Sequence, residues 1–417
     1  MKIRTTKTTH YPRTTSKTFE ILSDENCNYA VNAKKSGDGL LPGVSLATQT
    51  TFPSLPQGVN RAYYSQGNGA LYLLTSSAAY RISKGASSYT SIATSLTGNP
   101  FFTDMYFNGY AVTVFCNGYS RVIYTGLAQD TATDTKRFYC AAVHCGRFFA
   151  RDYLDGFKLW WSASHALDWE EGIYGCGYTY LPVEGGAILR LYSYGDRLIA
   201  VRERGITVIR AYGDPQNYKV DASANYMTAD GIIEDTCAES GGKIIFCTES
   251  GIFAFDGSGI DRLASFAAEG LSAPQFAAAS GDMYYLVCTI STLGSGRMYC
   301  FDLSENCGWP TTLTPRALFE GPDGAYAVSG NVAFKIVQSG QSLQWLSLPV
   351  ALGGRAAYLK KLRVCCDGDV SVSVSSLGVS RTFSGDGEHA VNMAGDMFKF
   401  TVTAYGKLRS VQAQAEV

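Results

Sequence analysis

The feature that most constrains the fold is a turn-and-strand unit that recurs along most of the chain. In each unit a turn containing Gly, Asn or Asp precedes a short apolar strand, and a second turn and a second strand follow, as in residues 242–247 and 251–257. The glycines that lead the units recur about every 40–50 residues. They are Gly69, Gly109, Gly146, Gly195, Gly242, Gly281 and Gly324.

A unit of this length has room for four short strands, which is the size of one propeller blade. One such sheet cannot bury both of its faces alone, so several must close into a ring. The 27 Tyr, 21 Phe and 44 Gly favour strands and tight turns. Helical periodicity is nearly absent, and its best candidate is the segment 261–271.

These observations predict an all-β chain built on a β-propeller of about seven blades, with six or eight also compatible. A set of packed β-sandwiches is the alternative. The ring is preferred because the period continues without a linker rich in Pro and Gly. We expect an extended N-terminal arm and lead-in over residues 1–54, the propeller over 55–350, and a small C-terminal β module over 351–417.

The N-terminal segment is rich in threonine and carries five cations before its first acidic residue, Glu20. It is either a disordered tail or an arm that becomes ordered against another protein chain. We expect the arm, with residues 1–20 pairing along a neighbour's strand edge. Its cations could meet an acidic surface on that neighbour or the phosphates of DNA, and the acidic surface is preferred because Tyr11 is the only aromatic residue before Phe19. The candidate interface residues are Lys2, Arg4, Lys7, Arg13 and Lys17.

The C-terminal module is predicted from clean alternation of apolar and polar residues over 362–364, 370–374 and 398–404, with Gly-Asp turns at 367–369 and 385–387. Strict alternation indicates strands with one buried and one solvated face.

Charge and cysteine content exclude several classes of protein. The net charge of −1 does not suit a chain that binds nucleic acid with its whole surface. No apolar run reaches the roughly 18 residues of a membrane-spanning helix, and the first residues lack the apolar centre of a signal peptide. The twelve cysteines show no CxxC spacing and lie mostly in apolar stretches, so we expect buried free thiols and no disulfides.

The usual catalytic and cofactor motifs are absent, and the four histidines have no metal-ligand spacing. We therefore expect no cofactor and no metal. The segment with the most potential catalytic side chains is 159–172. There Asp168, Glu170 or Glu171 could supply the carboxylate of a glycosidase beside Trp169. No second carboxylate from another blade is evident. A blade-edge turn pinned by Trp169, with its acids in solvent, is the preferred interpretation.

The same segment resembles a stretch in the β-propeller virion proteins of tailed phages. Trp161-Ser162 followed by Asp168-Trp169 matches it, although Ala166-Leu167 replaces the proline that precedes Asp-Trp in that family. Residues 195–206, 251–257 and 260–263 are similar to the strand pairs that follow. The resemblance spans residues 140–265, and the blade pattern extends it over 55–350. These relatives are tail nozzle, tail hub and packaged-DNA stabilisation proteins.

The resemblance implies a non-enzymatic structural protein of a phage tail or head–tail connector, assembled in the host cytoplasm and found in the virion. Several copies would form a ring that contacts portal, adaptor or other tail proteins. Phage DNA would pass through its channel without sequence readout. The alternative is a carbohydrate-active or carbohydrate-binding propeller, either a glycosidase or a receptor-binding protein.

Overall fold

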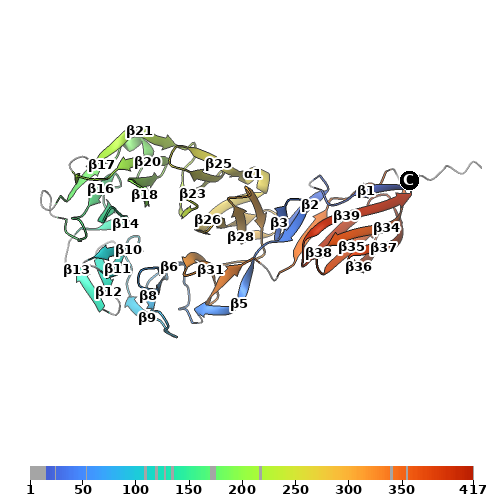
Figure 1. Ribbon diagram of the computed structural model, residues 1–417, viewed down its shortest axis with the longest axis horizontal. Coiled ribbons are helices and arrows are strands. Elements are labelled where there is room, and N and C mark those ends of the chain that lie inside the picture. The colour runs from blue at the N-terminus through green and yellow to red at the C-terminus, as the bar shows by residue number, and fades with distance from the viewer. Residues whose placement is uncertain are drawn as a thin grey trace, which may run out of the picture. The chain divides into compact units, whose positions relative to one another are not determined.

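The computed structural model describes residues 16–416 apart from 24, 53, 108–109, 118–120, 126–127, 133–135, 170–174, 216–217, 339–340 and 354–355. Nearly all regular structure in this part of the chain is β-strand (Figure 1). The chain divides into two compact units. One is Leu46–Val337, and the other combines the segment up to Ser45 with the segment from Gln338 onwards.

The first unit contains, among the residues described, seven antiparallel sheets of four strands each, here called blades 1 to 7 in chain order. Blade 1 consists of β6 (Arg61–Ser65), β7 (Ala70–Leu74), β8 (Ala79–Ile82) and β9 (Thr90–Ala93), and blade 2 of β10 (Phe101–Phe107), β11 (Tyr110–Cys116), β12 (Arg121–Thr125) and β13 (Ala128–Ala132). Blade 3 consists of β14 (Phe138–His144), β15 (Arg147–Asp152), β16 (Lys158–Trp161) and β17 (Gly177–Tyr180). Blade 4 consists of β18 (Ile188–Tyr194), β19 (Arg197–Arg202), β20 (Gly205–Arg210) and β21 (Lys219–Met227). A 3₁₀ turn, Val183–Gly185, precedes β18.

Blades 5 to 7 complete the set. They consist of β22 (Ile233–Ser240), β23 (Lys243–Thr248), β24 (Gly251–Phe255) and β25 (Ile260–Ser265); β26 (Leu271–Ser280), β27 (Met283–Ile290), β28 (Gly294–Asp302) and β29 (Cys307–Pro310); and β30 (Ala317–Gly321), β31 (Gly324–Ser329), β32 (Val332–Val337) and β5 (Ser45–Phe52).

The first strand of each blade contacts the first strands of both neighbouring blades, and β30 of blade 7 contacts β6 of blade 1. The seven sheets therefore form a closed ring (Figure 1), and the region around its axis is here called the central channel. Strand β5 precedes blade 1 in the chain but pairs with β32 as the outermost strand of blade 7. This pairing fastens the two ends of the ring. The expected all-β propeller of about seven blades is confirmed.

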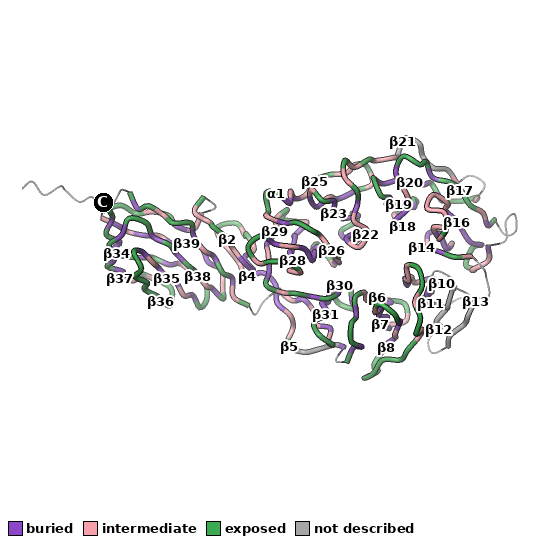
Figure 2. The backbone as a smooth tube through the Cα atoms, turned by 180° about the vertical axis from the view of Figure 1, so that it is seen from behind, coloured by how far each residue is buried: buried purple, intermediate pink, exposed green. Residues whose placement is uncertain are grey.

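The leading glycines mark the turn between the first and second strands of the blades. Gly69, Gly195 and Gly281 have φ values of 66°, 59° and 58°, in the left-handed region that tight hairpin turns require. The repeated unit of the sequence therefore corresponds to the second and third strands. The second strand of each blade is among the most deeply buried elements, as the purple segments of Figure 2 show.

The best candidate for helical periodicity, the segment 261–271, contains only one short helix. Residues up to Ser265 form β25, and α1 is a single turn, Phe266–Glu269. It ends at Gly270, which is left-handed with φ 66°. The apolar residues of this segment, Ala264 and Phe266, pack between blades 5 and 6, so packing across the blades decides the conformation here.

The second unit is a β-sandwich whose two described sheets draw strands from both ends of the chain. One sheet has the order β3-β4-β39-β34-β37, with β1 also paired to β39, and the other has the order β2-β33-β38-β35-β36. The strands are β1 (Ser16–Glu20), β2 (Cys27–Val31), β3 (Ala33–Ser36), β4 (Gly39–Pro42), β33 (Leu343–Ser347), β34 (Ala357–Cys366), β35 (Val370–Ser376), β36 (Val379–Ser384), β37 (Gly387–Gly395), β38 (Lys399–Ala404) and β39 (Leu408–Glu416).

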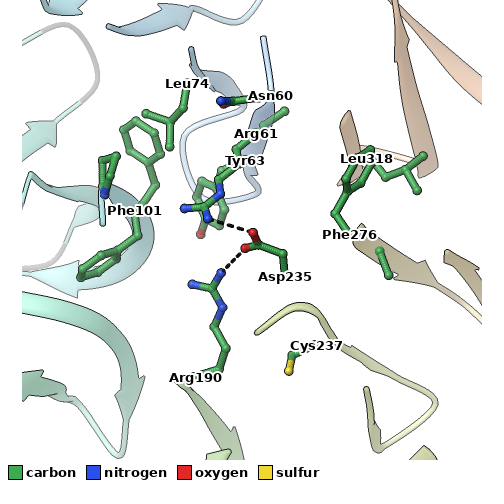
Figure 3. Close-up of a pocket in the computed structure, with 14 residues that line it drawn as sticks. Asn60, Arg61, Tyr63, Leu74, Phe101, Arg190, Asp235, Cys237, Phe276 and Leu318 are labelled. Carbon is green, nitrogen blue, oxygen red and sulfur yellow. Dashed lines mark hydrogen bonds and ion pairs between the residues drawn. The ribbon is translucent and has the colours of Figure 1, made fainter. Parts of the chain in front are cut away.

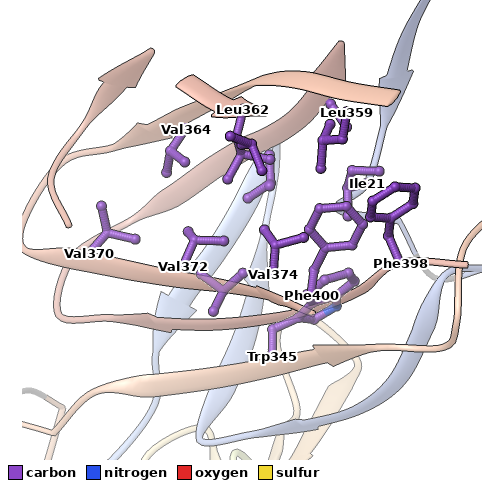
Figure 4. Close-up of a cluster of buried hydrophobic side chains, with 14 of the residues drawn as sticks. Ile21, Trp345, Leu359, Leu362, Val364, Val370, Val372, Val374, Phe398 and Phe400 are labelled. Atoms are coloured by element: carbon purple, nitrogen blue, oxygen red, sulfur yellow. The ribbon is translucent and has the colours of Figure 1, made fainter. Parts of the chain in front are cut away.

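The sandwich core follows the alternation of its sequence. Along β35 every second residue is buried, beginning with Val370. Figure 4 shows side chains of β34, such as Leu362, facing those of β35, such as Val372, across the two sheets, with Phe400 and Trp345 in the same core. The predicted strands and both Gly-Asp turns of this module are present.

The division of the chain differs from the expected boundaries at residues 54 and 350. Residues expected to form the arm and lead-in instead supply β1 to β4 of the sandwich and β5 of blade 7. Residues 16–20 pair within their own chain, Lys17 lying opposite Ala415, which corrects the expectation that all of residues 1–20 order only against another protein. The next residue, Ile21, is completely buried.

All twelve cysteines lie in the described part of the chain, and each is a free thiol. Seven are buried and only Cys145 is exposed. Burial raises the pKa of the Cys140 and Cys247 thiols to about 12. Both therefore stay protonated and behave as small apolar side chains.

Candidate functional site

The candidate site lies in the central channel of the propeller, where the first strands of several blades begin. A cavity of about 320 Å³ opens there (Figure 3). A second cavity of about 420 Å³ shares Arg61, Asp235 and Phe276 with it. We call the two together the central mouth. Its described lining side chains come from six blades, namely 1, 2 and 4 to 7, and include Asn60, Arg61, Tyr63, Leu74, Phe101, Arg190, Asp235, Phe276 and Leu318.

Irregular pairing in the inner strands accompanies these side chains. In β22 the register shifts between Ile233 and Ala238, so that Glu234 and Asp235 stand outside the regular ladder. A similar shift in β26 ends at Phe276, and one in β18 ends at Arg190. Because a bulge changes the face to which a side chain points, these shifts aim polar and aromatic groups into the channel.

The bulge in β22 is held by the side chain of Thr236. Its hydroxyl donates to the Ile233 carbonyl at 2.6 Å and accepts the Cys247 N–H at 2.9 Å. The main-chain carbonyl of Thr236 accepts a hydrogen bond from the hydroxyl of Tyr284 at 2.7 Å. These bonds replace the ladder bonds that the bulge removes.

Two carboxylates at the centre of the mouth are shared by two guanidinium groups. The two oxygens of Asp235 lie 3.0 Å from Nη2 of Arg61 and 3.0 Å from Nη2 of Arg190 (Figure 3). Glu234 lies 3.3 Å from the same nitrogen of Arg190 and accepts the Tyr139 hydroxyl at 2.6 Å. These contacts join blades 1, 3, 4 and 5.

Asn99, just before β10 of blade 2, completes the network. Its side chain accepts a hydrogen bond from Arg61 at 2.7 Å and donates one to Glu234 at 3.2 Å. A single polar network therefore spans the first five blades. Because Asp235 of blade 5 meets Arg61 of blade 1, side chains cross the channel at this level.

The surroundings of the network shift the pKa values of Arg190 and Tyr139 upward. Burial alone would lower the pKa of Arg190, but Glu234, Tyr192 and Asp235 more than offset it, and the net shift is upward. Burial and the hydrogen bond to Glu234 raise the pKa of Tyr139, so this hydroxyl remains a donor. The arrangement can hold a charged or polar ligand, and it ties the blades together.

The residues of the phage-like motif lie elsewhere, around blade 3: Trp169 packs between blades 2 and 3, and Trp161 packs between blades 3 and 4. Trp169 is buried, with its ring 4.6 Å from that of Phe138 and 5.7 Å from that of Phe148. Trp161 donates to the Gly175 carbonyl at 3.0 Å. The fully buried Ser162 accepts the N–H of Phe148 at 3.0 Å.

Asp168, the one carboxylate of that segment among the described residues, does not line the central mouth. The main-chain carbonyl of Asp168 accepts the Ala163 N–H at 3.0 Å, which closes the turn after β16. Glu170 and Glu171 lie outside the described residues. Asp168 and Trp169 thus belong to a connection packed on the blades, as the blade-edge interpretation predicts.

The candidate arm residues are mostly outside the described part of the chain. Lys2, Arg4, Lys7 and Arg13 precede Ser16, where the description begins. Lys17 is exposed on β1. His10 also precedes the described residues. Among the described residues, no group of three or more His, Cys, Asp or Glu side chains could hold a metal ion.

The residues of the central mouth were not singled out by the sequence. The available signal was a charged residue in the strand that precedes a leading glycine, as Arg190 stands before Gly195 and Asp235 before Gly242. Bulges hide this signal because they interrupt the alternation on which strand prediction depends.

The chain matches no protein-family model and no curated protein sequence. Its backbone is similar to PorZ of Porphyromonas gingivalis, a surface component of the type-IX secretion system, with 12% identity, a TM-score of 0.44 and coverage of 80% of this chain. This chain spans about half of the PorZ chain, 46% of its length.

Two further solved structures are similar. The Pan2 WD40 domain of Neurospora crassa is 10% identical over 68% of this chain and 90% of that domain, with a TM-score of 0.44. BBS1N, solved in complex with ARL6DN, is 11% identical over 70% of this chain and 96% of that chain, with a TM-score of 0.46. Our fold assignment rests on the seven sheets themselves. Over the stretches that the structure describes, no helix has the length and apolar character needed to cross a membrane.

Proposed function

We propose that this chain is a non-enzymatic structural protein of a phage tail or head–tail connector that works as a multimer. The observation that carries the proposal is the central network, in which Glu234 and Asp235 are held by Arg190, Arg61 and Tyr139. Carboxylates held in this way link five blades, which suits a rigid scaffold. The resemblance at Trp161, Ser162, Asp168 and Trp169 supports the same role.

The network also bears on how such a protein would handle DNA. Side chains from blades 1 and 5 meet across the channel of one propeller, so duplex DNA has no path through it at that level. In the proposed assembly, several copies of this chain therefore surround a DNA channel that lies between them. Portal, adaptor or other tail proteins are the proposed partners, and the tail of the virion is the proposed location.

The test is the mass and shape of the full-length protein in solution, measured by light scattering and electron microscopy, together with immunodetection in purified phage particles. The proposal expects ring-shaped multimers and a fixed copy number in particles. A protein that stays monomeric at every concentration and is absent from particles would overturn it.

A second candidate, carbohydrate binding, is favoured by one observation. In the central mouth Phe101 and Phe276 lie on either side of the polar side chains Arg61 and Asp235 (Figure 3), and sugar sites combine apolar rings with convergent polar groups. Hydrolysis is less well supported than binding. The two carboxylates are adjacent residues of one strand and share Arg190, whereas a glycosidase places its two carboxyl groups on either side of the scissile bond.

A further inference from the structure

The central mouth has an excess of positive charge. Three arginines line it, Arg61, Arg190 and Arg316. They meet two carboxylates, Asp235 in the lining and Glu234 on Arg190, so one positive charge is left over. Asp235 already has one oxygen on Arg61 and the other on Arg190. The mouth is therefore suited to a ligand that brings its own negative charge.

Arg316 is the group that such a ligand would meet first. It is exposed at the edge of the larger cavity, immediately before β30. Its guanidinium has no hydrogen-bond or ion-pair partner within the described segments. A guanidinium can bind a carboxylate through two parallel hydrogen bonds.

The other lining residues indicate the chemistry of the uncharged part of the ligand. Phe276 lines both cavities and lies near Leu318, whereas Phe101 lies on the far side of Arg61 and Asp235 (Figure 3). Asn60 and Ser76 also line the larger cavity, with amide and hydroxyl groups. A small ring with an apolar face for Phe276 and several hydroxyls for the polar groups suits this lining, and the cavities of about 320 and 420 Å³ have the size of small-molecule sites.

We propose that the central mouth binds a sugar that carries a carboxylate, of the uronic acid class. The carboxylate pairs with Arg316, the ring lies on Phe276, and the hydroxyls form hydrogen bonds with Asn60 and Ser76. No bond is broken, since Glu234 and Asp235 remain paired with arginine. This inference rests on the second proposed function, carbohydrate binding, and names its ligand class.

The test is calorimetric titration of the full-length protein with three probes that share a six-membered ring. Glucuronate has hydroxyls and a carboxylate, glucose lacks the carboxylate, and cyclohexanecarboxylate lacks the hydroxyls. We expect glucuronate to bind with a millimolar or lower Kd, and the two other probes at least about tenfold more weakly.

Two variants locate the site. Arg316→Gln should weaken glucuronate binding about tenfold or more, because a charge-assisted hydrogen bond is lost. Arg363→Gln, an exposed arginine on β34 of the sandwich, is the matched control and should leave the Kd unchanged. Melting curves of both variants should overlay that of the original protein, since Arg316 has no partner to lose.

The outcomes separate the two proposals. Equal binding of glucose would overturn the acidic class while leaving carbohydrate binding in place. Equal binding of cyclohexanecarboxylate would overturn both, since the hydroxyls would then contribute nothing. Binding that Arg316→Gln does not affect would overturn the assignment to the central mouth. Absence of binding by all three probes would overturn the inference and the second candidate function, without bearing on the multimer.

Discussion

At the scale of single residues, two kinds of side chain hold this molecule together. Large aromatic groups such as Trp169 fill the spaces between neighbouring blades. Charged groups such as Arg409 join loops that are distant in the sequence: this guanidinium lies 2.9 Å from Asp38 and 2.7 Å from Asp367. The first kind acts by removing apolar surface from water, and the second is sensitive to pH and salt.

Trp169→Ala should destabilise the propeller by about 3–5 kcal/mol, because it removes a buried ring and leaves a cavity beside Phe138 and Phe148. Chemical denaturation followed by circular dichroism measures the change. Leu154→Ala, at a side chain that is 80% exposed, is the control and should have little effect. An equally small effect of Trp169→Ala would show that the segment is not part of the core.

Arg409→Gln should lower the melting temperature at neutral pH, and the difference from the original protein should vanish in acid. A hydrogen bond from Lys407 lowers the pKa of the Asp38 carboxyl below the ordinary value of 3.8. A hydrogen bond from Arg409 likewise lowers the pKa of the Asp367 carboxyl. A lowered folded-state pKa stabilises the fold above the unfolded-state pKa, and this contribution is lost as the pH falls through the folded-state value.

Melting curves from pH 7 to pH 2 test this expectation. The two proteins should differ by a constant amount at pH 5–7 and converge below about pH 3.8. Arg363→Gln, an exposed arginine on β34, is again the control. A difference that persists unchanged at pH 2 would contradict the assigned role of the ion pairs.

At the scale of strands and turns, departures from regular pairing place the candidate site. The inner strands β18, β22 and β26 carry register shifts, and each shift lies at a residue that lines the central mouth. The regular strands behind them supply the buried faces of the blades. The bulged strands thus present side chains to the channel while the rest of each sheet forms the core.

Thr236→Val should destabilise the propeller by about 1–3 kcal/mol, because it leaves the N–H of Cys247 without its side-chain acceptor. The shape of the side chain is preserved, so packing is little changed. Denaturant unfolding measures the loss, with the exposed Thr401→Val as control. A variant as stable as the control would mean that the bulge does not depend on this hydroxyl.

Two deletions separate the N-terminal cations from β1. Removing residues 2–15 should leave the melting temperature unchanged and, if the proposed arm is an interface, reduce multimer formation. Removing residues 2–21 also takes away β1 and the buried Ile21, and should destabilise the sandwich by about 2–5 kcal/mol. Light scattering and thermal unfolding measure the two effects. Normal assembly of the shorter deletion would contradict the interface role.

At the scale of the whole molecule, the chain crosses between its two units twice, at Ser45–Leu46 and at Val337–Gln338. Strand β5 begins at the first crossing and β32 ends at the second, and the two strands are neighbours in blade 7. The propeller therefore has all its own strands in one continuous segment, whereas the sandwich needs both ends of the chain.

The fragment 45–337 should fold cooperatively by itself, because all seven sheets are complete within it. The fragment 54–337 lacks β5 and should be less stable by about 3–5 kcal/mol and more prone to aggregate. It loses Phe52, whose ring lies 6.3 Å from Phe319 and 5.8 Å from Tyr326. Equal stability of the two fragments in thermal and denaturant unfolding would show that β5 does not fasten the ring.

The sequence alone determined the features that depend on neighbouring residues. A glycine such as Gly195 takes the left-handed conformation of a tight turn, and Val370, Val372 and Val374 alternate with serines because one face of β35 is buried. Turn chemistry and period-two alternation are local, so they were sufficient for the blade repeat, the ring and the strands of the C-terminal module.

Only the tertiary structure decided which distant strands pair and where a strand bulges. Strand β1 pairs with β39 from the other end of the chain, and β5 joins blade 7, because the hydrogen bonds and burial that hold an edge strand come from residues far away in sequence. Asp235 meets Arg61 and Arg190 for the same reason. Their meeting depends on ring closure and on the bulge at residues 233–238, which no local pattern encodes.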